Sequence, residues 1–178
     1  MNLLYDTLRY FAKFPQHSAV LEMFNKGVSD IPVYAFLKSQ IANLPEHSIF
    51  PNIVDFIFDV SEETVVEKIN SLSGVFMFVD YGDMRTELYG PAKVQQHFFT
   101  LAITIAQRIT VAQYDNVERL IISDDMHNLL HRVIGVMQKD SDPFCKRISF
   151  PYLATPAIAR TTFQAIGWTV KFELKNIE

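Results

Sequence analysis

One stretch decides the fold: Gln96-His97-Phe98-Phe99-Thr100-Leu101-Ala102-Ile103-Thr104-Ile105-Ala106. Large and small side chains alternate along it with the period of a β-strand, which we expect from about Val94 to Gln107. The large residues Phe99, Leu101, Ile103 and Ile105 face one way. The residues between them, Thr100, Ala102, Thr104 and Ala106, are small. This predicts that a helix packs closely on that second face.

The segments around this strand predict further strands. Residues 75–79 read Val-Phe-Met-Phe-Val and form a buried strand, residues 80–83 read as a turn, and residues 86–89 predict a hairpin arm ending at Gly90-Pro91. Alternating residues predict strands at 53–60 and 166–174, each with one polar face. Ile148 and Phe150 predict a short strand broken by Pro151 and Pro156, inside a loop from Lys139 to Thr161 that carries three prolines.

Two longer helices are expected between these strands. The first is opened by Ser61-Glu62-Glu63 and ends at Ser73-Gly74, and the second is opened by a capping box of Asp115 and Glu118 and runs to about Met137. The buried stripe of the second helix is expected to comprise Ile122, Met126, Leu129, Val133 and Val136.

Three short helices are expected before residue 50. The first carries Leu4, Leu8 and Phe11 and stops at Pro15; the second is capped by Ser18 and ends at Gly27; the third follows Asp30, with Pro32 at its first position, and ends before Pro45. The chain is therefore predicted to be an α+β protein with a mixed, mainly antiparallel sheet and two packed helices. Residues 1–50 would be a helical extension and residues 51–178 the α+β domain.

Composition excludes several classes of protein. Of 178 residues, 49% are hydrophobic and 20% are charged, which is enough for a sizeable core, and the net charge of −4 gives no reason to expect a polyanion as the main ligand. Cys145 is the single cysteine, so no intrachain disulfide forms and a reducing compartment is expected. The N-terminus lacks the features of a signal peptide, and no apolar run is long enough to span a membrane.

Candidate catalytic residues are few. His127 and His131 lie one turn apart on the second helix beside Asp124 and Asp125, as a metal site would require, but an exposed polar face is the favoured interpretation. The three carboxylates Asp80, Asp83 and Glu87 lack the spacing of a calcium loop and predict a charged hairpin tip. Glycine-rich phosphate loops and the GxSxG elbow are absent from the sequence. We therefore expect no enzymatic activity, no cofactor and no metal.

The expected interaction surfaces are the arm of residues 80–91, the proline-rich loop of residues 139–161 and the N-terminal helices. Arms that extend from a sheet and carry apolar groups are typical of interlocking subunits. For Lys146, Arg147 and Arg160, a partner-facing surface is favoured over contact with nucleic acid. The predicted interface comprises Asp83, Met84, Arg85, Glu87, Leu88, Tyr89, Lys146, Arg147, Tyr152 and Arg160.

The layout of residues 61–175 resembles that of tail-terminator, tail-completion and head–tail neck proteins of tailed bacteriophages. The resemblance is carried by a helix, the segment 74–83, the strand 96–106, a helix with Leu120, Ile121, Leu129 and Leu130, and a strand ending at 167–172. It implies a virion protein, assembled in the host cytoplasm, that forms a homo-oligomeric ring at the head–tail junction or tail end.

The same resemblance implies portal, neck or tail proteins as partners, with non-specific DNA contact in the channel as a further possibility and no membrane contact. Two other functions remain open from the residues. One is a cellular or mobile-element interaction module of similar build. The other, less favoured, is a metal-dependent hydrolase using His127, His131 and Asp124.

Overall fold

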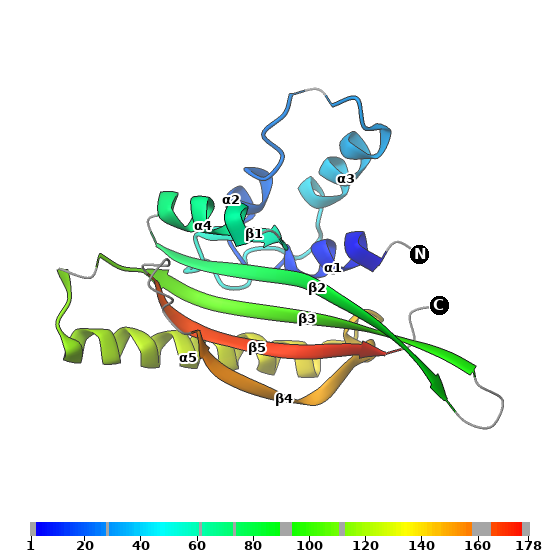
Figure 1. Ribbon diagram of the computed structural model, residues 1–178. Helices are drawn as coiled ribbons and strands as arrows, with labels where there is room; N and C mark the ends of the chain where they lie inside the picture. Colours follow the sequence, from blue (N-terminus) through cyan, green and yellow to red (C-terminus); the bar gives the residue numbers. More distant parts are fainter. Residues whose placement is uncertain are drawn as a thin grey trace.

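The structure is a computed structural model that describes residues 3–27, 29–60, 62–72, 74–89, 94–110, 113–157 and 165–175 (Figure 1). Within these ranges, the backbone alone is described for residues 62–64, 83–85, 89, 94–97, 150–157 and 175. The helices are α1 (Leu3–Phe11), α2 (His17–Leu21), α3 (Pro32–Ala42), α4 (Glu62–Ser71), α5 (Asn116–Lys139) and the 3-10 helix η2 (Cys145–Arg147). The strands are β1 (Asp55–Asp59), β2 (Val75–Tyr89), β3 (Val94–Arg108), β4 (Ile148–Ala157) and β5 (Ala165–Lys175).

The five strands form one sheet in the order β1-β2-β3-β5-β4. β1 pairs with β2 in parallel, and every other neighbouring pair is antiparallel. The last strand of the chain, β5, therefore lies between β3 and β4. The predicted α+β class, with a mixed and mainly antiparallel sheet, is confirmed.

The two longer helices cover opposite faces of the sheet. α5 packs on the face that carries Leu101, Ile103 and Ile105, in one core with Val170 and Phe172 of β5. α4 covers only one end of the other face, where its buried residues meet Ile57, Phe76, Ala106 and Ala165. The prediction that a helix packs along the small-residue face is therefore wrong over most of β3. The apolar face of α5 packs instead on the large residues of β3, because large side chains gain most from leaving water.

The uncovered part of the small-residue face is half-buried and polar. Thr100 and Thr104 of β3 are only partly exposed. The hydroxyls of Thr104 and Thr169 lie 2.7 Å apart and form a hydrogen bond across β3 and β5. At the α4 end, a Cβ on Gly167 would lie 2.2 Å from the carbonyl oxygen of Ile105 and 2.4 Å from the Cβ of Ala106. Only glycine allows this close approach of β5 to β3.

Two predicted interruptions of the strands are wrong. Residues 80–83 do not turn: β2 continues through them with a register shift between Asp80 and Asp83, as in a β-bulge. β4 likewise runs through Pro151 and Pro156, with a shift between Ser149 and Leu153. Proline is tolerated there because β4 is an edge strand, and an edge strand does not need every backbone N–H for pairing.

The face assignment of β1 is also corrected. The alternating pattern predicted Phe56 inside and the opposite face polar, but Phe56 and Ile57 are both buried. Ile57 packs beneath α4 with Val65 and Ile69. β1 is therefore covered on both faces.

The helices before residue 50 share the core of the sheet. Phe11, Phe14, Val20 and Ile41 are fully buried in the same cluster as Leu101 and the α5 stripe. Of the residues predicted for the first helix, Leu8 and Phe11 are buried and Leu4 is 37% exposed, while Thr7 and Tyr10 are also buried. Since each helix is short, this shared burial is what stabilises it.

The ends of the short helices differ from the sequence expectation. Ser18 lies inside α2, whose N-cap is Gln16, and α2 ends at Leu21, well before Gly27. The N-cap of α3 is Ile31 rather than Asp30, with Pro32 in the first turn as predicted. The serine that serves α2 comes from elsewhere: Ser48, with a left-handed φ of 54°, accepts a hydrogen bond at its Oγ from the backbone N–H of His17 over 3.0 Å.

Candidate interaction surfaces

The β2–β3 hairpin extends beyond the rest of the sheet (Figure 1). Pairing of β3 with β5 begins at Phe98, whereas β2 and β3 stay paired out to Tyr89 and Val94. Among the described strands, none therefore lies beside the segments 86–89 and 94–97, which we call the arm. Leu88 in the arm is 60% exposed. An exposed leucine on a two-stranded ribbon is a candidate contact with another chain.

On β2 the arm is shorter than the predicted segment of residues 80–91. Glu87, Leu88 and Tyr89 belong to it, but Asp83, Met84 and Arg85 lie at its base, opposite Thr100, Phe99 and Phe98. Asp80, Asp83 and Glu87 are spread along β2 and do not form a charged tip. The cause is the pairing with β3, which keeps β2 extended on both sides of the bulge where a turn was predicted.

The second predicted set of interface residues is mostly not in a loop. Lys146 is exposed and Arg147 half-buried, both in η2, and Tyr152 lies in β4. Arg160 lies outside the described residues. Because Ile148 pairs with Leu174, next to the Lys175–Phe98 pair, η2 lies at the end of the sheet from which the arm extends.

An exposed apolar surface on α5 was not predicted. Val117, Leu120 and Ile121 are 64%, 69% and 56% exposed. At spacing i, i+3 and i+4 they lie on one face of the first two turns, and we call them the α5 patch. The capping box that precedes them is confirmed, with Asp115 accepting from the amides of Val117 and Glu118. The capping box thus stabilises the start of the helix, while the apolar side chains of the patch face solvent.

The patch lies before the helix reaches the sheet core. The buried residues of α5 begin at Met126 and comprise Met126, Leu129, Leu130, Val133, Ile134 and Met137, while the predicted Ile122 and Val136 are half-buried. Figure 1 shows the first turns of α5 extending past the end of the strands. The sequence did carry a signal for the α5 patch, because three apolar residues precede the predicted buried stripe and lie off it.

The sheet edges are poor sites for strand addition. β4, at one edge, carries two prolines, which lack the backbone N–H that an incoming strand would need. β1, at the other edge, is only five residues long. An arm draped over a neighbouring subunit therefore fits this sheet better than edge-to-edge pairing of strands.

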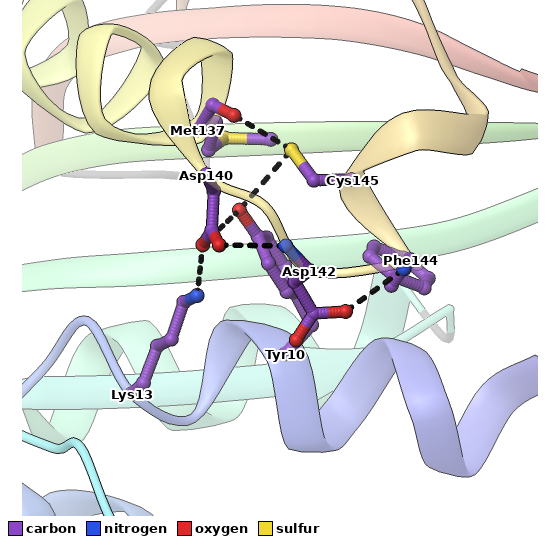
Figure 2. A network of polar contacts seen from close by, with 7 residues as sticks. All are labelled: Tyr10, Lys13, Met137, Asp140, Asp142, Phe144 and Cys145. Carbon is purple, nitrogen blue, oxygen red and sulfur yellow. Dashed lines mark hydrogen bonds and ion pairs between the residues drawn. The ribbon is translucent and has the colours of Figure 1, made fainter.

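A polar network joins α1 to the end of α5 (Figure 2). Lys13 forms an ion pair with Asp140, the C-cap of α5, and its Nζ lies 4.1 Å from the centroid of the Tyr10 ring. The Tyr10 hydroxyl lies 3.2 Å from Oδ2 of Asp140 and 3.3 Å from Sγ of Cys145. The Cys145 thiol donates to the carbonyl oxygen of Met137 over 2.8 Å. These contacts close the turn after α5 onto α1.

The titration behaviour of this network indicates a structural role. Burial, together with contacts to Cys145 and Asp140, raises the pKa of Tyr10. Burial also raises the pKa of the Cys145 thiol, so the thiol is protonated and lacks the thiolate that a nucleophile needs. For Asp140, burial acts to raise the pKa, but hydrogen bonds from Lys13 and from the amide of Asp142 outweigh it and lower the pKa. The network favours one charged pair and two neutral groups.

A groove of about 410 Å³ opens beside this network. It is lined by both signs of charge, with Arg9, Lys13 and Arg147 against Asp6, Glu46 and Asp140. Lys13, the most buried cation of the groove, is already paired with Asp140. The two charges therefore neutralise each other and are not available to bind a ligand.

The histidine pair on α5 is a local contact. The Nε2 atoms of His127 and His131 lie 3.0 Å apart, and the ring of His127 packs on Trp168 at 4.6 Å between centroids. Asp124 accepts instead from Asn128 over 3.1 Å. Among the described residues, no group of three or more His, Cys, Asp or Glu side chains is placed to hold a metal ion. In the same part of the chain, none of the helices has the length and apolar content to cross a membrane.

No family model, curated protein or solved structure matches the chain.

Proposed function

We propose that this protein is a structural subunit that assembles with copies of itself into a ring, at the head–tail junction or tail end of a tailed bacteriophage. Portal, neck or tail proteins would be its neighbours. The phage assignment is supported by the resemblance of the element order in residues 61–175, and the assembly role by the surfaces of the fold.

The observation that carries the proposal is the arm. It continues two strands beyond the rest of the sheet, with no third strand beside it in the described parts of the chain, and presents Leu88 to solvent. An isolated two-stranded ribbon is only marginally stable in water, and an exposed leucine on it adds to that cost. A second chain that covers the arm removes both disadvantages, so the arm is better suited to an assembled state than to a monomer.

The prolines of β4 support the same conclusion. They oppose open-ended growth by edge pairing, which would lead to aggregates rather than a closed particle. The buried polar network adds a further point, because its Cys145 has a raised pKa and its Lys13 is paired. The strongest polar cluster in the described chain therefore stabilises the fold and supplies no activated nucleophile.

The test has two parts. The purified protein is expected to form a homo-oligomer with a central opening, measured by mass photometry and electron microscopy. A variant in which residues 86–97 are replaced by Asn-Gly keeps the Arg85–Phe98 pair at a two-residue turn, and it is expected to be a folded monomer by circular dichroism and sedimentation.

Assignment to a virion is tested separately. Mass spectrometry of purified tailed particles from the host is expected to detect the chain at a fixed ratio to the portal. A wild-type protein that stays monomeric at several hundred micromolar, and that is missing from such particles, would contradict the proposal.

A further inference from the structure

We infer that the arm of one copy lies against the α5 patch of the next copy, so that subunits associate head to tail. This inference rests on the proposed function, because it names the two surfaces through which the ring is built.

The two surfaces lie at opposite ends of the molecule. β3 leaves the arm at Val94 and ends at Arg108, and α5 begins a few residues later at Asn116. Fifteen strand residues span roughly 50 Å at about 3.3 Å each. Figure 1 shows the arm and the start of α5 extending from opposite ends of the sheet. An arm therefore cannot reach the patch of its own chain, whereas the arm of another copy can.

The surfaces match in size and in chemistry. The arm segment Thr86–Tyr89 is about 13 Å long as a strand, and the first two turns of α5 are about 11 Å long. Leu88 on the arm and the three residues of the α5 patch are apolar and more than half exposed. Their contact would bury apolar surface on both sides.

Charge opposes contact between two patches. Residues 115–125, around the patch, contain four acidic residues and Arg119, a net charge of −3. In the arm segments 86–89 and 94–97, Glu87 is the only charged residue, a net charge of −1. Two patches facing each other would therefore repel more strongly than an arm facing a patch.

The geometry of such a contact leads to closure. Each copy offers one arm and one patch, so the interface is heterologous, and repeating it gives a ring if the rotation closes. Isologous pairing would instead stop at a dimer. The inference thus links the surfaces to the ring state.

The experiment compares three single variants with the wild-type protein. Leu88→Glu in the arm and Leu120→Glu in the patch are each expected to weaken association at least tenfold and to give monomers by sedimentation velocity. Ile31→Glu is the matched control, because Ile31 is 63% exposed and apolar but belongs to neither surface. It is expected to assemble as the wild type does, and circular dichroism checks that all three are folded.

Mixing the two monomeric variants tests the head-to-tail arrangement. The Leu120→Glu chain keeps an intact arm, and the Leu88→Glu chain keeps an intact patch. One unaltered interface can therefore form between them, while the other would oppose two glutamates. The expected product is a one-to-one heterodimer that grows no further.

The outcomes separate this inference from the proposed function. If the wild type assembles and the arm and patch variants assemble equally well, the inference is overturned while the proposed function stands. If both variants are monomeric and their mixture stays monomeric, the head-to-tail arrangement is overturned. A wild-type protein that does not self-associate overturns both.

Discussion

Replacing Asp140 with asparagine should destabilise the fold strongly, although the side chain changes little in size. The carboxylate is the ionic partner of Lys13, and the two side chains are only 17% and 9% exposed. Asp140→Asn leaves the ammonium group buried between α1 and the end of α5 without a counter-charge. The rings of Tyr10 and Phe14, with centroids 4.1 Å and 5.5 Å from Nζ, remain in contact with the ammonium group.

The size of the loss follows from this geometry. Removing one partner of a buried ion pair costs about 3–5 kcal/mol, because the remaining charge is left unpaired. The cation–π contact retains about 1 kcal/mol, and Asp140 lies at the wall of an open groove. We therefore expect Asp140→Asn to lower the free energy of unfolding by about 3 kcal/mol at pH 7.

Urea unfolding of four proteins measures this effect: wild type, Asp140→Asn, Lys13→Met and the double variant. The double variant is expected to lose less than the two single variants added together, by at least about 1.5 kcal/mol, because neither charge is then left alone. Asp59→Asn is the matched control. Its pair with Lys68 spans 3.9 Å and is more exposed, so it should cost under about 0.5 kcal/mol.

Acidification should remove the difference between the wild type and Asp140→Asn. The pKa of Asp140 in the folded protein is lowered, so its contribution is complete above the unfolded pKa of about 4. It is lost as the pH falls from there towards the folded pKa. A difference below about 1 kcal/mol at pH 7, or one unchanged between pH 7 and pH 3, would refute this account of the pair.

Three further predictions concern the helix start, the glycines and the thiol. Asp115→Ala removes the capping box and should lower the free energy of unfolding by about 1 kcal/mol in a thermal melt. Gly135→Ala, with nothing within 4 Å of the added Cβ, should raise the free energy of unfolding by up to about 1 kcal/mol. Gly167→Ala should lower the free energy of unfolding by more than about 2 kcal/mol. Equal effects of the two substitutions would show that the close approach of β5 to β3 is relaxed in solution. Cys145, which is buried and has a raised pKa, should react with a thiol reagent at pH 7.5 only in urea, and rapid labelling of the native protein would contradict the closed network.

Local sequence signals predicted the elements that depend on neighbouring residues alone. The Asp115–Glu118 capping box is such a signal, since both partners lie within one turn. The alternation of β3 and β5 predicted strands of nearly the observed bounds because a period of two reflects the backbone itself. Long, strongly patterned segments were therefore placed correctly.

Features that depend on a distant strand were not predicted. Whether residues 80–83 turn or bulge is decided by β3, which continues beside them and holds β2 extended. Pro151 and Pro156 are compatible with a strand only because β4 is at the edge, and strand order cannot be read from local pattern.

The candidate interaction surface was predicted in part. Leu88 was assigned to an exposed arm because it follows a strand and precedes Gly90-Pro91. The α5 patch was missed because helical periodicity identifies residues that share a face, but not how far along the helix the sheet extends. How far the sheet extends along α5 depends on tertiary packing, and it leaves Leu120 exposed while Leu129 is buried.

The position of β5 has a consequence for how the chain folds as it is synthesised. β5 is the last of the five described strands to be made, yet it supplies the pairing partner for both β3 and β4. Until residues 165–175 leave the ribosome, β3 presents an open, apolar edge and β4 has no neighbour. The nascent protein therefore depends on rapid completion or on chaperones to avoid premature pairing with other chains.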